Sequence, residues 1–259
     1  MIDEPYRWVE AVENRREYIE TQLAGGSPIA AVGCADGIVF VTLGSTRQKL
    51  FEIYDRIAMG AVGHPGDIER LRMAAIELAS TEGFTRSAAD VSLRRLAYYS
   101  LSPMLKSAFE QIYGAPFLAR MLFAEIGDSP ANDLIMRIEY DGAIATNGAT
   151  ISDARQDFGV LSGTTESANL MEAYLKKEHD PAASLDSAVR VAIDTWTVGN
   201  MALGENGARE LPNREAIDAA RAKQASATGV EAALLERAAR TAIRYRTLSR
   251  EEVDAALAR

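Results

Sequence analysis

Side chains that commonly carry out chemistry are few in this chain of 259 residues. Its two histidines, His64 and His179, lie far apart and have no companion cysteines. A histidine-based metal site or a serine–histidine–aspartate triad therefore lacks the groups it needs, and we expect each histidine to be structural or exposed. Cys34 is the one cysteine, which excludes an intrachain disulfide and favours a reducing compartment. We expect no metal and no cofactor.

The composition is that of an ordinary globular protein, with 47% hydrophobic and 25% charged residues. The length is still compatible with one domain. A formal net charge of −9 argues against a nucleic-acid partner and against docking on anionic membranes. No apolar run approaches the roughly 20 residues needed to span a bilayer, and the acidic first residues lack an apolar signal region. We expect a cytoplasmic protein.

The elements that must position any site begin with a helix. Apolar residues recur at helical spacing near the start of the chain: Val9, Val12, Ile19 and Leu23. Pro5 precedes them, and the glycines at 25 and 26 end the pattern as a C-terminal stop. Such a helix lies either on its own domain or against a neighbouring subunit, and the periodicity favours neither.

Strands and helices then alternate in groups. Two apolar runs, 29–34 and 38–42, flank Ala35-Asp36-Gly37, which predicts a hairpin. Further strands are predicted at 50–54, 57–62, 117–126, 134–140, 160–163, 230–236 and 243–248. Helices are predicted after residue 66, at 87–112, 165–177, 184–198 and 214–223, and after a Ser-x-x-Glu capping box at 249–252. This order favours two sheets covered by helices over a parallel βαβ sheet.

Residues 49–75 read KLFEIYDRIAMGAVGHPGDIERLRMAA and resemble the corresponding segment of actinobacterial-type proteasome α subunits. Residues 35–39 (ADGIV) resemble that family's first turn, and residues 162–166 (SGTTE) resemble its segment before the third helix. The resemblance covers most of residues 6–200. It implies the N-terminal nucleophile hydrolase fold, an α+β, four-layer αββα sandwich of two antiparallel sheets between helical layers, with an N-terminal helix. Residues 1–24 would form a gate segment and helix, and residues 25–259 one structural unit.

Catalytic members of this fold use an amino-terminal threonine, whose free amine is the base, together with a lysine and an aspartate. The resemblance places Ser27 at the nucleophile, Leu43 at the acid and Lys49 at the lysine. Ser27 follows other residues, so its nitrogen is a non-basic amide, and Leu43 cannot hydrogen-bond a base. Pro28 also constrains the adjacent backbone. We expect no catalytic residue. The alternative is a self-processed serine hydrolase that uses Ser27 and Lys49 after cleavage behind Gly26.

Lys49 has three possible roles: a relic of the catalytic lysine, an exposed strand-end lysine, or the pocket lysine of α rings. In the family, that pocket lies between adjacent α subunits and captures the C-terminal carboxylate of an activator. A lysine suits this task because it is a mobile point charge. We favour the pocket, and the resemblance adds Glu17 and Gly26 from the helix end and Gly63 beside the fourth strand.

The resemblance implies that the first residues form the axial gate: Ile2, Asp3, Glu4, Pro5 and Tyr6. The alternative is a frayed terminus. The leading hypothesis is a homo-oligomeric ring, of seven copies as in the family, that admits unfolded protein to a chamber of separate catalytic β subunits. The same ring would dock an ATP-dependent unfoldase. A homo-oligomer with an unrelated binding role is a further alternative, since fold does not fix function.

Overall fold

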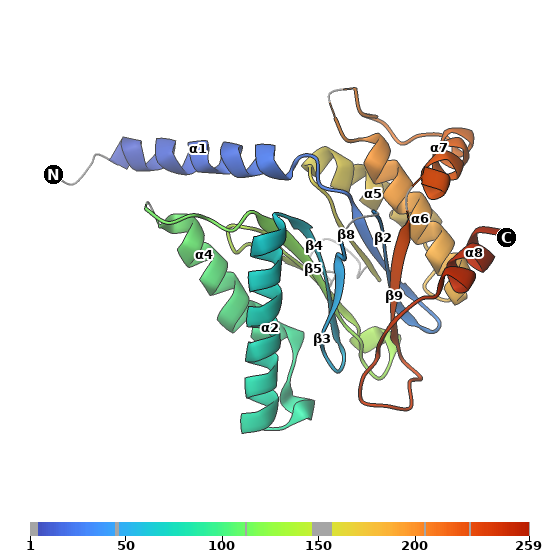
Figure 1. The fold of residues 1–259 in the computed structure, drawn as a ribbon, viewed down its shortest axis with the longest axis horizontal. Coiled ribbons are helices and arrows are strands. Elements are labelled where there is room, and N and C mark those ends of the chain that lie inside the picture. The colour runs from blue at the N-terminus through green and yellow to red at the C-terminus, as the bar shows by residue number, and fades with distance from the viewer. Residues whose placement is uncertain are drawn as a thin grey trace.

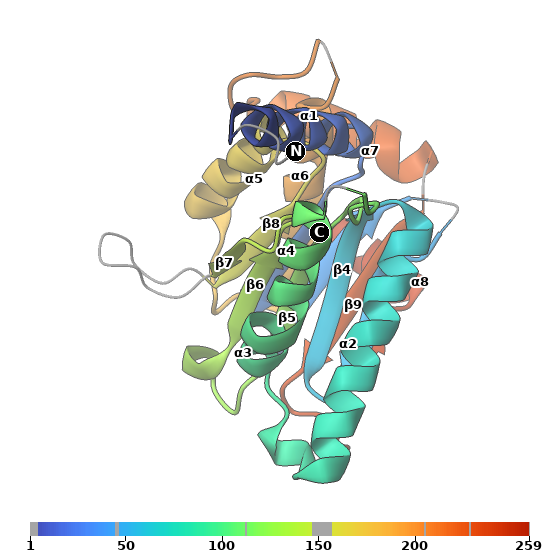
Figure 2. The ribbon, with the colours of Figure 1, turned by 90° about the vertical axis from the view of Figure 1, so that its left-hand side faces the viewer.

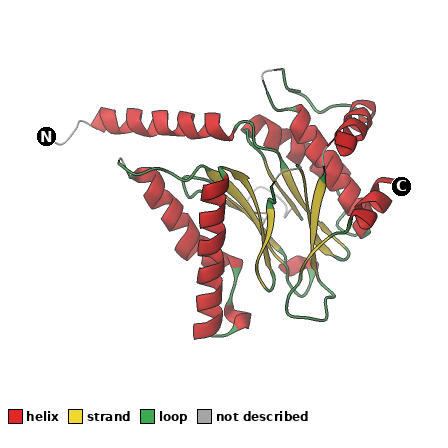
Figure 3. Ribbon diagram, viewed as in Figure 1, coloured by secondary structure: helices red, strands yellow, loops and turns green. Residues whose placement is uncertain are grey.

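Two antiparallel sheets pack face to face at the centre of the molecule (Figure 3). A computed structural model describes residues 5–44, 47–111, 113–146, 157–204, 206–227 and 229–258. One five-stranded sheet has the order β10-β9-β2-β1-β8, and the other has the order β3-β4-β5-β6-β7. The strands of the first sheet are β1 (Ile29–Cys34), β2 (Gly37–Leu43), β8 (Phe158–Leu161), β9 (Val230–Glu236) and β10 (Tyr245–Thr247). Those of the second are β3 (Leu50–Tyr54), β4 (Ile57–Gly63), β5 (Ala119–Glu125), β6 (Leu134–Ile138) and β7 (Ile144–Thr146).

Helices cover both outer faces of this sandwich (Figure 1). The helices against the second sheet are α2 (Pro65–Thr85), α3 (Leu93–Leu96) and α4 (Ser102–Glu110). Those against the first sheet are α5 (Thr165–Glu178), α6 (Leu185–Met201) and α8 (Arg250–Ala258), with α7 (Arg214–Ala227) packed on α6. The predicted α+β, four-layer αββα sandwich is confirmed.

The central strands are buried on both faces, which explains their continuous apolar runs. Every residue of β1 and β2 is buried. Ala31 and Phe40 face the second sheet and pack with Leu122, whereas Val32 and Val39 face the helices. Because successive side chains of a strand point to opposite faces, a strand covered on both sides needs apolar residues at every position. The predicted hairpin is confirmed, since β1 and β2 pair from Cys34 and Gly37 outward.

The prediction of one continuous helix over residues 87–112 is wrong. A 3₁₀ turn (Ala88–Asp90) comes first, and a π-helical turn (Ala97–Leu101) joins α3 to α4. In that turn Ser102 donates its backbone N–H to Ala97, five residues back. Pro103 follows directly; it lacks an N–H, and its ring would clash with the carbonyl of residue 99 in a regular helix. The π-helical turn accommodates this proline.

Helix α1 (Pro5–Leu23) lies across one end of the sandwich and projects beyond it (Figure 1). Figure 2 shows the same helix obliquely, above both sheets. The helix begins at Pro5, which the sequence pattern placed before it. Proline suits the first helical position, where its missing N–H would have no intrahelical acceptor. In the projecting half, Trp8 and Val9 are exposed.

A buried carboxylate holds α7 against α6. Asp194 on α6 is 1% exposed and pairs with Arg214 at 2.9 Å and with Arg221, both on α7. Tyr174 donates its hydroxyl to the same carboxylate at 3.2 Å. A buried charge is tolerated when it is paired and hydrogen-bonded in this way. The predicted helix at 214–223 is confirmed and extends to Ala227.

The helix ends agree with the predicted caps. Ser184 accepts a hydrogen bond from Ser187 N at the start of α6. At the start of α8, Ser249 and Glu252 exchange reciprocal side chain to backbone hydrogen bonds of 3.2 and 2.7 Å, which is a capping box. Within the described ranges, no helix combines the length and the apolar character needed to cross a bilayer.

Candidate carboxylate-binding pocket

A cavity of about 320 Å³ opens where four parts of the chain meet. They are the end of α1, the connection between β2 and β3, the end of β4 and the first turn of α2. Three of the four residues expected in the pocket, Gly26, Lys49 and Gly63, line this cavity. The other lining residues are Ser27, Gly44, Arg47, Gln48, Phe51, Ala61, Val62, Pro65, Ile68 and Glu69.

Lys49 supplies a half-buried cation to this cavity. It directly precedes β3, and its Nζ donates to the Leu43 carbonyl at 3.4 Å. Burial lowers the pKa of Lys49 below its ordinary value, and the nearby charge of Glu231 opposes this shift. An ammonium has three N–H donors. Within the described part of the chain Leu43 takes one of them, which leaves donors for a ligand.

Apolar groups form the wall beside the cation. Phe51 on β3, Val62 on β4 and Ile68 on α2 all line the cavity. The Arg72 guanidinium lies 5.5 Å from the centre of the Phe51 ring, where the ring face attracts a cation. A cation beside an apolar wall suits a ligand with a carboxylate next to an apolar side chain.

Two glycines allow the backbone to close around the cavity. A Cβ on Gly26 would lie 2.1 Å from a methyl carbon of Val62. Gly63 has a φ of +142°, and a Cβ there would lie 2.1 Å from the Leu118 carbonyl oxygen. Any other residue at either position would force α1 or β4 to move.

The position of the nucleophile is occupied by a serine with a structural role. Ser27 donates its hydroxyl to the Leu43 carbonyl at 2.7 Å and accepts from Trp196 Nε1 at 3.1 Å. A carbonyl is not a base, and the Ser27 nitrogen lies within the chain as a peptide amide. This arrangement gives no support to a Ser27 hydrolase, because general-base activation of the hydroxyl is missing from the described contacts.

The segment ahead of Ser27 is fastened to the body. Arg120 on β5 is 6% exposed and binds both carboxylate oxygens of Glu20 on α1, each at 2.6 Å. Arg120 also donates to the carbonyls of Ser162 and Gly163, at 3.2 and 2.9 Å. Tyr140 donates its hydroxyl to Glu20 at 2.7 Å. Arg120 and Tyr140 thus tie α1 to the body of the fold through the Glu20 carboxylate.

The remaining predicted site residues lie away from the cavity. Glu17 is exposed on α1, and its backbone carbonyl accepts a hydrogen bond from the Thr21 side-chain hydroxyl. Pro5 and Tyr6 begin α1, whereas the other expected gate residues (2–4) lie outside the described residues. The structure therefore brings together Lys49 and two glycines.

Both histidines have structural contacts. His64 accepts from the Gly66 amide at 3.2 Å as the N-cap of α2. The His179 ring bonds the Gly33 carbonyl through Nε2 at 2.8 Å and meets Phe158 edge-on. The expectation that each is structural or exposed is confirmed.

Two residues at this site carried no signal in the sequence. Trp196 comes from α6 to fix Ser27, and Glu231 comes from β9 to bind the backbone of Lys49. Both are far away along the chain, and each sits in an ordinary apolar pattern. Only the packing of the two sheets brings them to the site.

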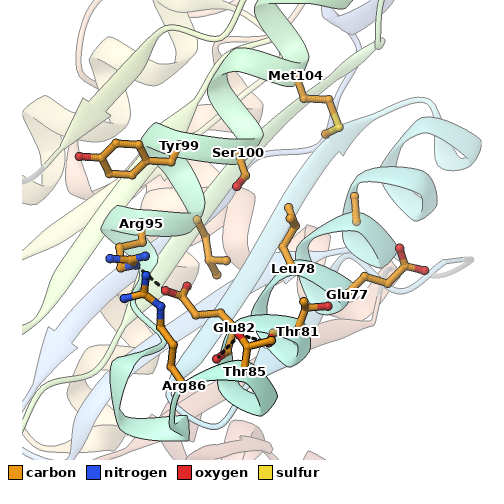
Figure 4. A pocket seen from close by; sticks show the side chains of 12 residues that line it. Glu77, Leu78, Thr81, Glu82, Thr85, Arg86, Arg95, Tyr99, Ser100 and Met104 are labelled. Carbon is orange, nitrogen blue, oxygen red and sulfur yellow. Dashed lines mark hydrogen bonds and ion pairs between the residues drawn. The ribbon is translucent and has the colours of Figure 1, made fainter.

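A second, larger cavity of about 560 Å³ lies between α2 and the segment α3–α4 (Figure 4). Its ionic groups are partly neutralised, because Arg95 pairs with Glu82 across the groove. Tyr99, which is 81% exposed, lies at its rim, and Phe84 elsewhere on α2 is 92% exposed. This face offers aromatic contact area, and its cations, Arg86 and Arg95, lie at the groove between α2 and α3.

The fold and the first cavity define a class of protein: a four-layer αββα sandwich with a lysine at one cavity and with the Ser27 hydroxyl bound to a carbonyl. No protein-family model matches the chain. It is 34% identical over 186 residues to a proteasome subunit alpha of Nocardioides sp., covering 71% of this chain and 68% of that protein. A proteasome subunit alpha of Parafrankia sp. is 32% identical over 211 residues, covering 78% and 79%. One of Frankia casuarinae is 33% identical over 212 residues, covering 78% and 80%.

The chain therefore belongs to the proteasome α-subunit family. Membership makes it a non-catalytic subunit that assembles with other subunits into a proteasome complex, in protein degradation.

Proposed function

We propose that copies of this chain form the outer ring of a proteasome core particle, control the admission of substrate and dock an ATP-dependent activator. The observation that carries the proposal is the cation of Lys49 at the end of an apolar-walled cavity. Peptide cleavage then belongs to the threonines of separate β subunits. The ring has seven copies, as the resemblance implies, and acts in the cytoplasm.

The activator docks through its C-terminus. Its carboxylate binds the free donors of Lys49, and its last apolar side chain packs against Phe51, Val62 and Ile68. A free carboxylate is recognised well by a point charge of this kind. Glu17 joins this pocket only when a second copy places its α1 beside it, because within one chain Glu17 is exposed.

A pair of synthetic peptides tests this proposal. Both end in the same apolar residue, one with a free carboxylate and the other with a C-terminal amide. The assembled ring should bind the free carboxylate more tightly, and Lys49→Ala should lower that affinity roughly 10- to 100-fold, because hydrogen bonds to charged groups are worth about 1.5–3 kcal/mol. Fluorescence anisotropy measures both affinities.

Lys106→Ala is the matched control. Lys106 is exposed on α4 and pairs with Glu110 one turn away, so its loss should leave peptide affinity unchanged. Ring assembly should survive both substitutions. Equal binding of the two peptides by the unchanged ring would refute the docking role.

The N-terminal segment is the proposed gate. Ile2, Asp3 and Glu4 would lie over the axial opening, with Pro5 and Tyr6 at the point where α1 begins. Residues 1–24 then act as gate segment and helix, and residues 25–259 as the body. The anchored half of α1 supports this proposal, because it holds one end of the segment in a fixed place.

The face of α2 and α4 is where we expect the β subunits. Its exposed aromatic residues, Phe84, Tyr98 and Tyr99, are of the type enriched in interface cores. Unfolded protein passing through the ring would reach the catalytic chamber on this side.

A further inference from the structure

Glu231 lies behind the pocket, on a strand of the opposite sheet. It belongs to β9, opposite Thr42 of β2. Its carboxylate accepts from the Lys49 amide at 3.0 and 3.1 Å and from the Leu50 amide at 2.9 Å. One side chain of the first sheet therefore holds the start of β3 in the second sheet.

This contact provides a hydrogen-bond acceptor at the start of β3, a strand at the edge of its sheet. β3 is at the edge of its sheet, so amides on its outer side have no neighbouring strand to receive them. Partly buried amides of that kind require another acceptor. Glu231 supplies it for Leu50, the first residue of β3, and also accepts from the amide of Lys49, which directly precedes the strand.

We propose that Glu231 is the positioning residue of the pocket, which fixes the backbone of Lys49 and places a negative charge behind its ammonium without occupying it. This inference rests on the proposed docking role of Lys49. The carboxylate oxygens of Glu231 are engaged by backbone amides, whereas the ammonium bonds the Leu43 carbonyl. A carboxylate bound directly to the ammonium would compete with the ligand; one held by amides does not.

The electrostatics of the pair agree with this geometry. Burial lowers the pKa of Lys49 and raises the pKa of Glu231, and in each case the charge of the other group opposes the shift. Each group therefore favours the charged form of the other. Removing the carboxylate should lower the pKa of Lys49 further, so the ammonium would lose its proton at a lower pH.

Other ionisable groups near Lys49 keep their protonation state in the alkaline range where Lys49 loses its proton. Arg47 and Glu69 line the same cavity, and the hydrogen bond from Arg72 lowers the pKa of Glu69, so this carboxylate is already ionised. Tyr245 donates to the Leu50 carbonyl at 3.1 Å, and burial raises its pKa above the usual range. Glu52, whose charge acts on Tyr245, is also ionised there. A change in carboxylate binding across that range therefore reports on Lys49.

The experiment compares Glu231→Gln with Glu236→Gln in the assembled ring. Glu236 lies on the same strand and pairs with Arg246 away from the cavity, so it is a matched control. The probes are the free-carboxylate and amide peptides, titrated across a pH series. Glu231→Gln should reduce the carboxylate preference roughly 10-fold and shift its loss to lower pH. Glu236→Gln should change neither.

If Glu231 only held the fold, Glu231→Gln would lower the affinity for both peptides equally and would not change the pH at which half of the carboxylate preference is lost. That result would overturn the proposal. Glu231→Asp gives a second check, because it keeps the charge but shortens the reach. It should retain the pH midpoint while losing affinity, and a downward shift equal to that of Glu231→Gln would also overturn the proposal. If Lys49→Ala removes the carboxylate preference and Glu231→Gln does not alter it, the docking role stands and only the positioning role fails.

Discussion

At the scale of single residues, the Leu43 carbonyl is the centre of the site. It accepts the Ser27 hydroxyl at 2.7 Å and the Lys49 ammonium at 3.4 Å. In a nucleophile enzyme of this fold a base would take the serine proton. Here the Ser27 proton is donated to the Leu43 carbonyl, and Trp196 donates its indole N–H to the Ser27 hydroxyl oxygen. The residues that the family resemblance placed at the nucleophile and the acid are thus joined to Lys49 through one shared carbonyl acceptor.

Ser27→Ala tests this structural role. The substitution leaves the Trp196 N–H without its acceptor, which should lower the free energy of unfolding by about 1–3 kcal/mol. Urea denaturation followed by circular dichroism measures the change. Ser107→Ala, at an exposed position on α4, should stay within about 0.5 kcal/mol of the unchanged protein. If Ser27→Ala instead abolished a peptidase activity of the isolated chain, Ser27 would be a nucleophile.

Sequence reasoning reached part of this site. Lys49, Gly26 and Gly63 followed from family resemblance and do line one cavity. Glu231 could not be predicted, because it lies 182 residues from Lys49 and meets it only through the packing of two sheets. Spacing along one chain segment carries no information about such a pair.

At the scale of elements, α1 has two halves with different surroundings. Ile19 and Leu23 are buried against Phe109 and Tyr140, and this end is further held by buried ion pairs. The first half projects beyond the sandwich (Figure 1). Each of the two expected positions therefore applies to one half of this helix. The second half packs on its own domain, and the first half is available to a neighbouring subunit.

Deletion of residues 2–6 tests the gate. Hydrolysis of an unfolded protein by the assembled core particle should accelerate severalfold, because the axial opening loses its cover. Ring assembly should persist, because the anchor at Ile19 and Leu23 remains. Unchanged hydrolysis, with intact rings seen by native mass spectrometry, would contradict a gating role for this segment.

The sequence predicted helices and strands most accurately where neighbouring residues determine the structure. Apolar runs marked the buried strands, and Ser184 and the 249–252 capping box marked helix starts correctly. The broken helix around Pro103 was missed because helical periodicity continues on both sides of the π-helical turn. Strand β7 (Ile144–Thr146) was missed because three residues at a sheet edge produce no periodic signal.

At the scale of the whole molecule, the sandwich brings distant parts of the chain to one pocket. α1, β3, β4 and α2 line the cavity, while α6 and β9 support it from the other sheet. The resemblance predicted this architecture, and similarity to proteasome subunit alpha of three actinobacterial organisms establishes the family. Neither the resemblance nor the family explains why α7 is held by Asp194, a feature that only the structure showed.

The central claim is that this chain keeps α1 ahead of Ser27 and does not generate an N-terminal nucleophile. The intact mass of the purified chain tests it most directly. We predict the mass of a chain that begins at Met1 or Ile2, with α1 still attached. The mass of a chain that begins at Ser27 would contradict the account, because cleavage there would release the free amine that an N-terminal nucleophile requires.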